Sequence, residues 1–393
     1  MLNMCDLLIV GAGAAGFFAA IQAKAMHPQA RVVLLEKSAV LLSKVKISGG
    51  GRCNVTHACF DPAALVRNYP RGHLELRGPF HCFQPQDTIE WFEKRGVMLK
   101  AEADGRVFPV TDKSETIIQC LLGEANRLGV EIFTRQRIDT IEKIDGGFSL
   151  GGFSCKKLLL ATGSAPDGHK WAEQLGHTIQ KPVPSLFTFN VPTSPLKELS
   201  GVAVPMAELK IVGTSLVQKG PLLITHFGFS GPAVLKLSAW GARVFNEKEY
   251  RLDIAINWLP EWSEVQILEI LIGMKKRGPQ NHLENVFKLP KNLWKVLVDD
   301  ERRLNDISVK DLQKYAKKLH ADIYHVEGKT THKEEFVTCG GVHLKEVDFK
   351  TMQSKICKGL YFAGEILDID GVTGGFNFQA AWTTGYIAGS SFS

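Results

Sequence analysis

The chain has 393 residues, of which 45% are hydrophobic and 22% charged, a composition typical of a globular protein with two or three domains. Its net charge of +6 is small and spread along the chain, so charge alone does not indicate nucleic-acid binding. None of the eight cysteines forms a C-x-x-C pair, which argues against zinc ribbons and thioredoxin-type motifs. We therefore expect a reduced, cytoplasmic setting with no metal site. The sequence shows no signal peptide and no apolar stretch near the ~20 residues that span a bilayer, so we expect no membrane contact.

The first 36 residues predict a β–turn–α–β unit. An apolar strand over Cys5–Val10 leads into a glycine-rich turn, a helix follows, and Arg31–Glu36 forms the second strand. The turn has the dinucleotide fingerprint G-x-G-x-x-G. Its first glycine makes the tight turn, the second admits a pyrophosphate, and the third allows close helix–strand packing. The residues assigned to this site are Gly11, Gly13, Ala14, Ala15 and Gly16, with Glu36 for the ribose hydroxyls and Lys37 beside it.

The predicted secondary structure changes several times in the middle of the chain. Residues 37–60 are expected to be loop and contain the densest glycine cluster. The further elements expected are helices over 86–96 and 114–128, with Ser114 as a candidate cap, and strands over Arg137–Lys143, Phe148–Phe153 and Lys157–Ala161. From about Leu186 to Leu259, short β-like runs predict a barrel or sandwich, and a charged, helix-patterned segment follows.

The last part of the sequence again has an α/β pattern. A buried strand is expected over Gly359–Glu365 and a helix over Phe376–Gly389. We therefore predict an α/β fold, namely a Rossmann-like FAD-binding domain interrupted by an insertion. The predicted bounds are 1–188 and 341–393 for the flavin domain, 189–260 and 321–340 for an inserted β-barrel, and 261–320 for a small helical subdomain.

The fingerprint alone does not separate FAD from NAD, but two later strand–turn segments resemble the further signatures of the glutathione-reductase-like, two-dinucleotide-binding flavoproteins. The resemblance implies that Gly364 and Glu365 lie along the pyrophosphate and ribitol. It also implies a helix N-terminus near Gly375 at the flavin pyrimidine edge, where it would stabilise negative charge on reduced flavin. The cofactor residues implied in these segments are Ala161, Thr162, Gly163, Gly364, Glu365, Thr373, Gly374, Gly375, Phe376 and Asn377, together with Ile138.

Three further segments make a closer resemblance, to the BaiN/RdsA-type bacterial flavoproteins, a group that includes aminoacetone-oxidase-like enzymes. They are Lys46–Asn54, Thr225–Pro232, and Thr338–Val342 with the following 351–355. The resemblance covers essentially the whole chain and implies FAD. The sequence shows no motif for covalent attachment, so we expect the FAD to be bound non-covalently. Three consecutive glycines also suit contact of main-chain N–H groups with an anion or ring edge. The flavin-contacting residues expected here are Lys46, Ser48, Gly50, Gly51, Arg52, Cys53 and Asn54.

Three side chains are candidates for a catalytic or redox role, and each also has a purely structural interpretation. Arg52 could offset negative charge on reduced flavin or substrate, or be a surface arginine. Cys53 could be a redox partner of the flavin, or a packing thiol. His226 is the best candidate for acid–base work, because imidazole transfers protons near neutral pH, and the alternative is a structural histidine.

These features predict an FAD-dependent oxidoreductase that moves a hydride between a small-molecule substrate and flavin N5, with O₂ or transiently bound NAD(P)H as the other redox partner. The sequence has no second dinucleotide fingerprint and lacks the motif cysteine pair of disulfide reductases. Both absences argue against a disulfide reductase. One alternative is an FAD-binding RNA-modification or nucleic-acid accessory protein, prompted by Lys275-Lys276-Arg277, Arg302-Arg303 and Lys317-Lys318, although such charges are usually a solvated face. Another is an NAD-dependent dehydrogenase without flavin. The sequence does not predict an oligomeric state.

Overall fold

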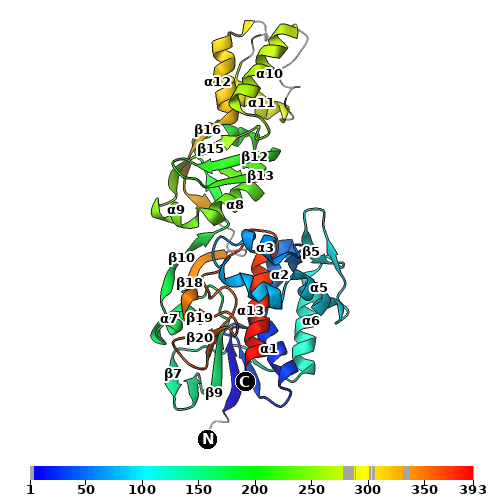
Figure 1. Ribbon diagram of the computed structural model, residues 1–393, viewed down its shortest axis with the longest axis vertical. Coiled ribbons are helices and arrows are strands. Elements are labelled where there is room, and N and C mark those ends of the chain that lie inside the picture. The colour runs from blue at the N-terminus through cyan, green and yellow to red at the C-terminus, as the bar shows by residue number, and fades with distance from the viewer. Residues whose placement is uncertain are drawn as a thin grey trace. The chain divides into compact units, whose positions relative to one another are not determined.

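The computed structural model describes residues 4–277, 287, 289–300, 302, 306–330 and 337–392. The chain divides into two compact units, of which unit 1 comprises Met1–Val183 and Lys333–Ser393 and unit 2 comprises Pro184–His332 (Figure 1). The predicted flavin domain instead ends at 188 and resumes at 341. The residues just before 341 belong with unit 1 because the strand β18 (Val337–Val342) pairs with β10 (Ile179–Ser185).

A nine-stranded sheet forms the centre of unit 1, which has the Rossmann-like α/β architecture expected from the sequence. Its strands β21, β9, β1, β2 and β6 are neighbours in that order and run parallel. Apolar residues bury both faces of the neighbouring strands β1 and β2, as the register Leu8↔Val33 illustrates, whereas β6 is only partly buried. The strands of this sheet are β1 (Cys5–Val10), β2 (Val32–Leu35), β6 (Glu131–Phe133), β7 (Ile141–Ile144), β8 (Gly147–Leu150), β9 (Phe153–Leu160), β19 (Val347–Asp348), β20 (Gln353–Ser354) and β21 (Leu360–Phe362).

Two helices from opposite ends of the chain lie side by side against this sheet, α1 (Ala14–Met26) and α13 (Phe376–Ser391) (Figure 1). Their backbones approach closely because small residues face each other. A Cβ on Gly385 would lie 2.6 Å from the Ala15 carbonyl oxygen. The N-terminal and C-terminal parts of unit 1 are thereby joined through one packed helix pair.

The remaining elements of unit 1 surround this framework. They are the helices α2 (Ser43–Gly51), α3 (Pro62–Leu65), α4 (Pro79–Cys82), α5 (Pro85–Glu93), α6 (Ser114–Arg127) and α7 (Pro166–Gln174), and the three-stranded sheet of β3 (Thr56–His57), β5 (Arg106–Pro109) and β4 (Leu99–Ala101).

Three local expectations differ from the structure. The segment 37–60 is not all loop, since α2 occupies part of it before the backbone leaves helical geometry at Ser48. Ser114 does not cap α6, because Lys113 is the N-cap residue and the Ser114 hydroxyl donates to the Lys46 carbonyl (2.7 Å). The predicted strand over Phe148–Phe153 is two strands, because Gly151 and Gly152 turn the chain between β8 and β9.

Unit 2 is built on a seven-stranded antiparallel sheet in the order β16-β15-β12-β13-β14-β11-β17. Burial alternates along β16, as expected for a strand with one face on a core. Its strands are β11 (Thr188–Asn190), β12 (Ala203–Ile211), β13 (Val217–Thr225), β14 (Gly228–Ser230), β15 (Arg251–Asn257), β16 (Asp322–Glu327) and β17 (Lys329–Thr330). Its helices are α8 (Pro232–Trp240), α9 (Ala242–Glu247), α10 (Glu264–Arg277), α11 (Lys291–Val298) and α12 (Val309–His320).

One hydrophobic core runs through unit 2, from sheet residues such as Leu209 and Ile254 to helix residues such as Leu293 and Leu312. The segment predicted as a separate helical subdomain therefore shares its core with the sheet. Among the helices that the structure describes in the whole chain, none is long and apolar enough to cross a bilayer.

Candidate flavin-binding site

The turn between β1 and α1 leaves open space at one of its three glycines and is tightly packed at the other two. Gly11 has φ +107°, and a Cβ there would lie 2.4 Å from the Ala161 carbonyl oxygen. A Cβ on Gly16 would lie 2.0 Å from the Gly11 carbonyl oxygen. A Cβ on Gly13 would meet nothing within 4 Å. This is the arrangement of a turn that presents its middle glycine to a pyrophosphate.

The first turn of α1 offers hydrogen-bond donors at the same place. Gly13 is its N-cap and provides no side-chain cap. The first intrahelical bond runs from the Phe17 N–H to the Gly13 carbonyl (3.0 Å), so the N–H groups of Ala14, Ala15 and Gly16 have no partner within the helix. Free N–H groups and the helix dipole together favour an anionic phosphate.

Glu36 follows β2, and its carboxylate already has two backbone donors. One oxygen accepts from the Ala12 N–H (3.1 Å) and the other from the Ser38 N–H (2.9 Å). A carboxylate has about four lone-pair positions, so the predicted bonds to ribose hydroxyls remain available. The neighbouring Lys37 is exposed and lies 3.6 Å from the Asp167 carboxylate.

The carboxyl ends of β9 and β21 meet beside this turn. The two strands pair in parallel with Leu160 opposite Phe362, so Ala161-Thr162-Gly163 and Gly364-Glu365 follow at the same edge of the sheet. A Cβ on Gly364 would lie 2.9 Å from the Ala15 Cβ, which places it against the start of α1. Ligands of open parallel sheets bind at this edge.

Glu365 is fixed by two partners that the sequence did not predict. Its carboxylate accepts from the Thr338 N–H (3.0 Å) and forms an ion pair with Lys44 (2.5 Å). Lys46, which the sequence analysis gives as a flavin contact, is exposed. Lys44 carries no motif and lies 321 residues from Glu365, so only the fold connects the two.

The glycine-rich end of α2 exposes main chain. Ser48, Gly49 and Gly50 leave helical geometry, and a Cβ on Gly50 or Gly51 would meet nothing within 4 Å. The Ser48 hydroxyl donates to the Val45 carbonyl (3.0 Å). The segment therefore provides open backbone, as the sequence predicts for contact with a ring edge or an anion.

Arg52 is held by partners from its own part of unit 1. Its guanidinium lies 2.7 Å from Glu102 and 3.5 Å from Asp112, and it stacks over the Phe108 ring at 3.9 Å. The hydrogen bond to Glu102 raises the pKa of Arg52 further. These contacts account for the position of the guanidinium as an ion pair with a cation–π contact.

Cys53 is fully buried, with φ +61°. Burial raises the pKa of its thiol to about 12, so the thiol is protonated at neutral pH. This environment favours the packing interpretation of Cys53 over the redox one.

The loop that leads into α13 is held by side chains from distant segments. Gly375 is the N-cap of α13. With its amide oriented to satisfy both ends, Asn54 accepts from the Gly375 N–H (3.0 Å) and donates to the Thr56 carbonyl (2.9 Å). Asn377 pairs with both backbone groups of Gly371 (2.8 and 3.0 Å). Asn54 and Asn377, both predicted as flavin-contacting residues, thus shape the loop around Thr373 and Gly374.

Three further anchors of this loop were not found from the sequence. The His57 ring nitrogen Nδ1 lies 3.0 Å from the Gly374 carbonyl oxygen, and the ring stacks on Phe376. The Tyr69 hydroxyl donates to the Phe376 carbonyl (2.7 Å). Arg71 forms an ion pair with Asp370, whose side chain is fully buried. A ring or hydroxyl that binds a backbone carbonyl leaves no sequence pattern.

Two further predicted residues belong to segments other than these turns. His226 belongs to unit 2, where it is exposed between β13 and β14 with its ring against Phe227. Ile138 is buried in unit 1, and its Cδ1 atom lies 2.5 Å from the position that a Cβ on Gly151 would take.

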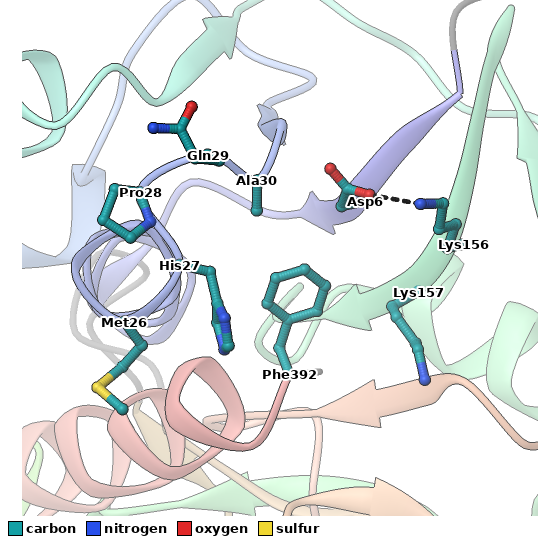
Figure 2. Close-up of a pocket in the computed structure, with 9 residues that line it drawn as sticks. All are labelled: Asp6, Met26, His27, Pro28, Gln29, Ala30, Lys156, Lys157 and Phe392. Carbon is teal, nitrogen blue, oxygen red and sulfur yellow. Dashed lines mark hydrogen bonds and ion pairs between the residues drawn. The ribbon is translucent and has the colours of Figure 1, made fainter.

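A cavity of about 600 Å³ lies elsewhere in unit 1. Figure 2 shows its lining, which includes the Asp6–Lys156 ion pair, His27 and Phe392. Asp6 lies near the start of β1, whereas the glycine turn follows the end of that strand. The cavity is therefore distinct from the cofactor edge of the sheet.

The residues at the carboxyl edge of the sheet fit FAD. Gly13 and Gly50 leave space that a Cβ would enter, α1 offers unpaired N–H groups, and Glu36 and Glu365 supply carboxylates. This combination defines a Rossmann-type, FAD-dependent oxidoreductase.

Comparison with known proteins identifies the family. Residues 5–391 match the model of the HI0933-like protein Rossmann domain, so the chain belongs to this family. The chain is 32% identical to a ribosomal RNA dihydrouridine synthase of Escherichia coli K12, over 97% of this chain and 96% of the relative. It is 29% identical to the protein of that name in Haemophilus influenzae, over the full length of both.

A third relative and a solved structure extend the comparison. The chain is 27% identical to a 3-dehydro-bile acid delta(4,6)-reductase of Clostridium scindens, over 97% of both chains. A crystal structure of 3-ketosteroid-delta4-(5alpha)-dehydrogenase from Rhodococcus jostii RHA1 matches with a TM-score of 0.51 at 14% identity, over 100% of this chain and 97% of that one. At this identity the match supports the fold alone.

Proposed function

We propose that this chain is a flavin-dependent reductase that adds two hydrogens across a carbon–carbon double bond conjugated to a carbonyl, and that its substrate is a uridine of ribosomal RNA. The observation that carries the proposal is the likeness, over nearly the whole chain, to two ribosomal RNA dihydrouridine synthases at 32% and 29% identity. The bile acid relative is also named as a reductase of double bonds. This favours the RNA-directed alternative of the sequence analysis over a free small molecule.

The reaction balances with one two-electron donor. When bound, FAD would supply the hydride chemistry: one carbon of the double bond would gain a hydride and the other a proton, with NAD(P)H as the transient co-substrate that provides the two electrons. The residues of unit 1 would hold the cofactor. Gly13 and the start of α1 would receive the pyrophosphate, and the anchored loop before α13 would direct a helix N-terminus toward the flavin.

His226 is our candidate for the group that delivers the proton. It is an exposed imidazole in a Gly/Ser/Pro-rich turn of unit 2. Imidazole exchanges protons near neutral pH, and general acid catalysis contributes about 10²–10⁴-fold to rate. We expect His226→Asn to lower turnover by about 10²-fold or more with unchanged FAD content. Full turnover by this variant, in a stopped-flow assay of flavin reoxidation by substrate, would assign His226 a structural role.

The test of the proposed function uses purified protein loaded with FAD. Anaerobic titration with NADH and with NADPH identifies the donor by bleaching of the flavin absorption. The reduced protein is then incubated with transcribed ribosomal RNA, and nuclease fragments are analysed by mass spectrometry. We expect a gain of two hydrogens at a uridine. No mass gain in any fragment, together with reduction of a conjugated steroid dienone, would overturn RNA as the substrate and leave the reductase class.

A further inference from the structure

Helix α12 of unit 2 has a basic exposed side. Leu312, Ala316 and Leu319 are buried in the unit 2 core. The rest of the helix carries four lysines, Lys310, Lys314, Lys317 and Lys318, against the single acidic residue Asp311. The spacing of Lys310, Lys314 and Lys317 places them on one face of the helix, over a length of about 10 Å.

Helix stability explains only part of this pattern. A lysine in the last turn, such as Lys317, interacts favourably with the helix dipole. Lys310 lies in the first turn, where the dipole disfavours a cation. The neighbouring α11 begins with Lys291 and has no acidic residue in its first turn. The position of Lys310 therefore needs a reason other than the stability of α12.

The α12 lysines also differ from the other basic residues of this region. Lys310, Lys317 and Lys318 form no ion pair with any residue that the structure describes, and Lys314 lies 3.6 Å from Asp311. By contrast, the Lys275 ammonium donates to the Ile307 carbonyl, and Arg302 is paired with Asp300 and Asp311. Of the other residues noted in the sequence analysis, Arg303 and the Arg277 side chain lie outside the described part of the structure.

The acidic residues nearby do not cancel this charge. Asp300 and Asp311 both contact Arg302. The hydrogen bond from Arg302 to Asp300, and those from Ser308 and Arg302 to Asp311, hold the pKa of both carboxyls below the usual range. Lys310 and Lys317 are thus left without an ion-pair partner among the described residues, whereas Lys318 interacts electrostatically with the buried Asp322 carboxyl. Helices α10, α11 and α12 pack together within unit 2, which brings the lysines of α11 and α12 into one bundle (Figure 1).

We infer that the lysine face of α12, defined as Lys310, Lys314, Lys317 and Lys318, binds the phosphate backbone of the RNA substrate, with α11 adding charge beside it. The inference rests on the proposed function. Lysine is a flexible point charge, so this surface would position RNA without reading its sequence. Choice of the uridine would then fall to contacts at the flavin.

The test compares two triple variants with equal loss of charge. Lys310→Gln, Lys314→Gln and Lys317→Gln removes the lysine face and keeps good helix formers. Lys181→Gln, Lys345→Gln and Lys350→Gln removes three exposed lysines of unit 1 as the control. Filter binding of a ribosomal RNA transcript is measured across a salt series. We expect the first variant to bind at least about 10-fold more weakly at low salt, with the slope of log K against log salt reduced by about 3.

The control variant should match the unaltered protein, and reduction of a small conjugated dienone should be unchanged in both variants. An α12 variant that binds RNA with unaltered affinity and slope would overturn this inference, as would an unaltered protein that shows no salt-dependent RNA binding. Failure of the proposed function has a different signature. The unaltered protein would then bind RNA through the lysine face but add no hydrogens to it.

Discussion

The two glycine-rich turns of unit 1 reach their shapes by different means. The Gly11–Gly16 turn is set by its own backbone, since Gly11 and Gly16 leave no room for a Cβ and Gly13 faces open space. The loop over Asp370–Gly375 is held instead by side chains of the 54–71 segment, namely Asn54, His57, Tyr69 and Arg71. A turn of the first kind is local in sequence, and one of the second kind depends on the whole fold.

Two valine substitutions in the Gly11–Gly16 turn should separate cofactor binding from folding, with the largest effects that we expect. Gly13→Val places a branched side chain in space meant for phosphate, so the FAD content of purified protein should fall to less than about a tenth, with thermal unfolding of the apoprotein unchanged. Gly16→Val should prevent folding, because its Cβ would overlap the Gly11 carbonyl. Full flavin content in Gly13→Val protein would show that the cofactor lies elsewhere.

The loop over Asp370–Gly375 should be disrupted by a substitution at Arg71, which is distant in sequence. Arg71→Met leaves the fully buried Asp370 carboxylate without its ion pair, which we expect to lower the free energy of unfolding by about 3–5 kcal/mol in urea titration. The double variant Arg71→Met with Asp370→Asn removes the unpaired charge and should recover part of the loss. A destabilisation below about 1 kcal/mol would mean that the pair does not hold the loop.

Glu36 gives a smaller and more specific effect on the first turn. Glu36→Ala removes the acceptor of the Ala12 and Ser38 N–H groups and of the ribose hydroxyls. We expect FAD binding to weaken by about 1.5–3 kcal/mol, the scale of hydrogen bonds to a charged group. Isothermal titration of the apoprotein with FAD measures this loss, and Glu36→Gln, which keeps an acceptor oxygen, is the control. Equal affinity of the alanine variant and the unaltered protein would contradict the assignment.

Cys53 should give the smallest effect. Because burial raises the pKa of its thiol, the reactive thiolate appears only as pH rises toward about 12. At pH 7–8, iodoacetamide should label the exposed Cys82 in folded protein and leave Cys53 unmodified, as peptide mass spectrometry would show. Cys53→Ala should keep its flavin reduction rate. Rapid labelling of Cys53, or loss of turnover in the variant, would restore the redox interpretation.

The same contrast explains what the sequence could predict. Strand β1, the fingerprint turn, α1 and the start of α13 at Gly375 follow from apolar runs and glycine spacing that lie within a few residues of each other. The side chains that hold the second turn could not be predicted in this way, because they are distant in sequence. His57, for example, lies 317 residues from Gly374. The role of Arg52 shows the converse limit. Its residue type and segment suit a flavin contact, and only the fold shows that Glu102 and Phe108 also contact its guanidinium.

The pairing of α1 with α13 also sets an order of events during synthesis. Helix α1 leaves the ribosome long before α13, which packs on it and is complete only at Ser391. Unit 2 is continuous in sequence from Pro184 to His332, so it can fold before α13 has been made. The nascent chain therefore carries an exposed apolar α1 surface until α13 has been synthesised.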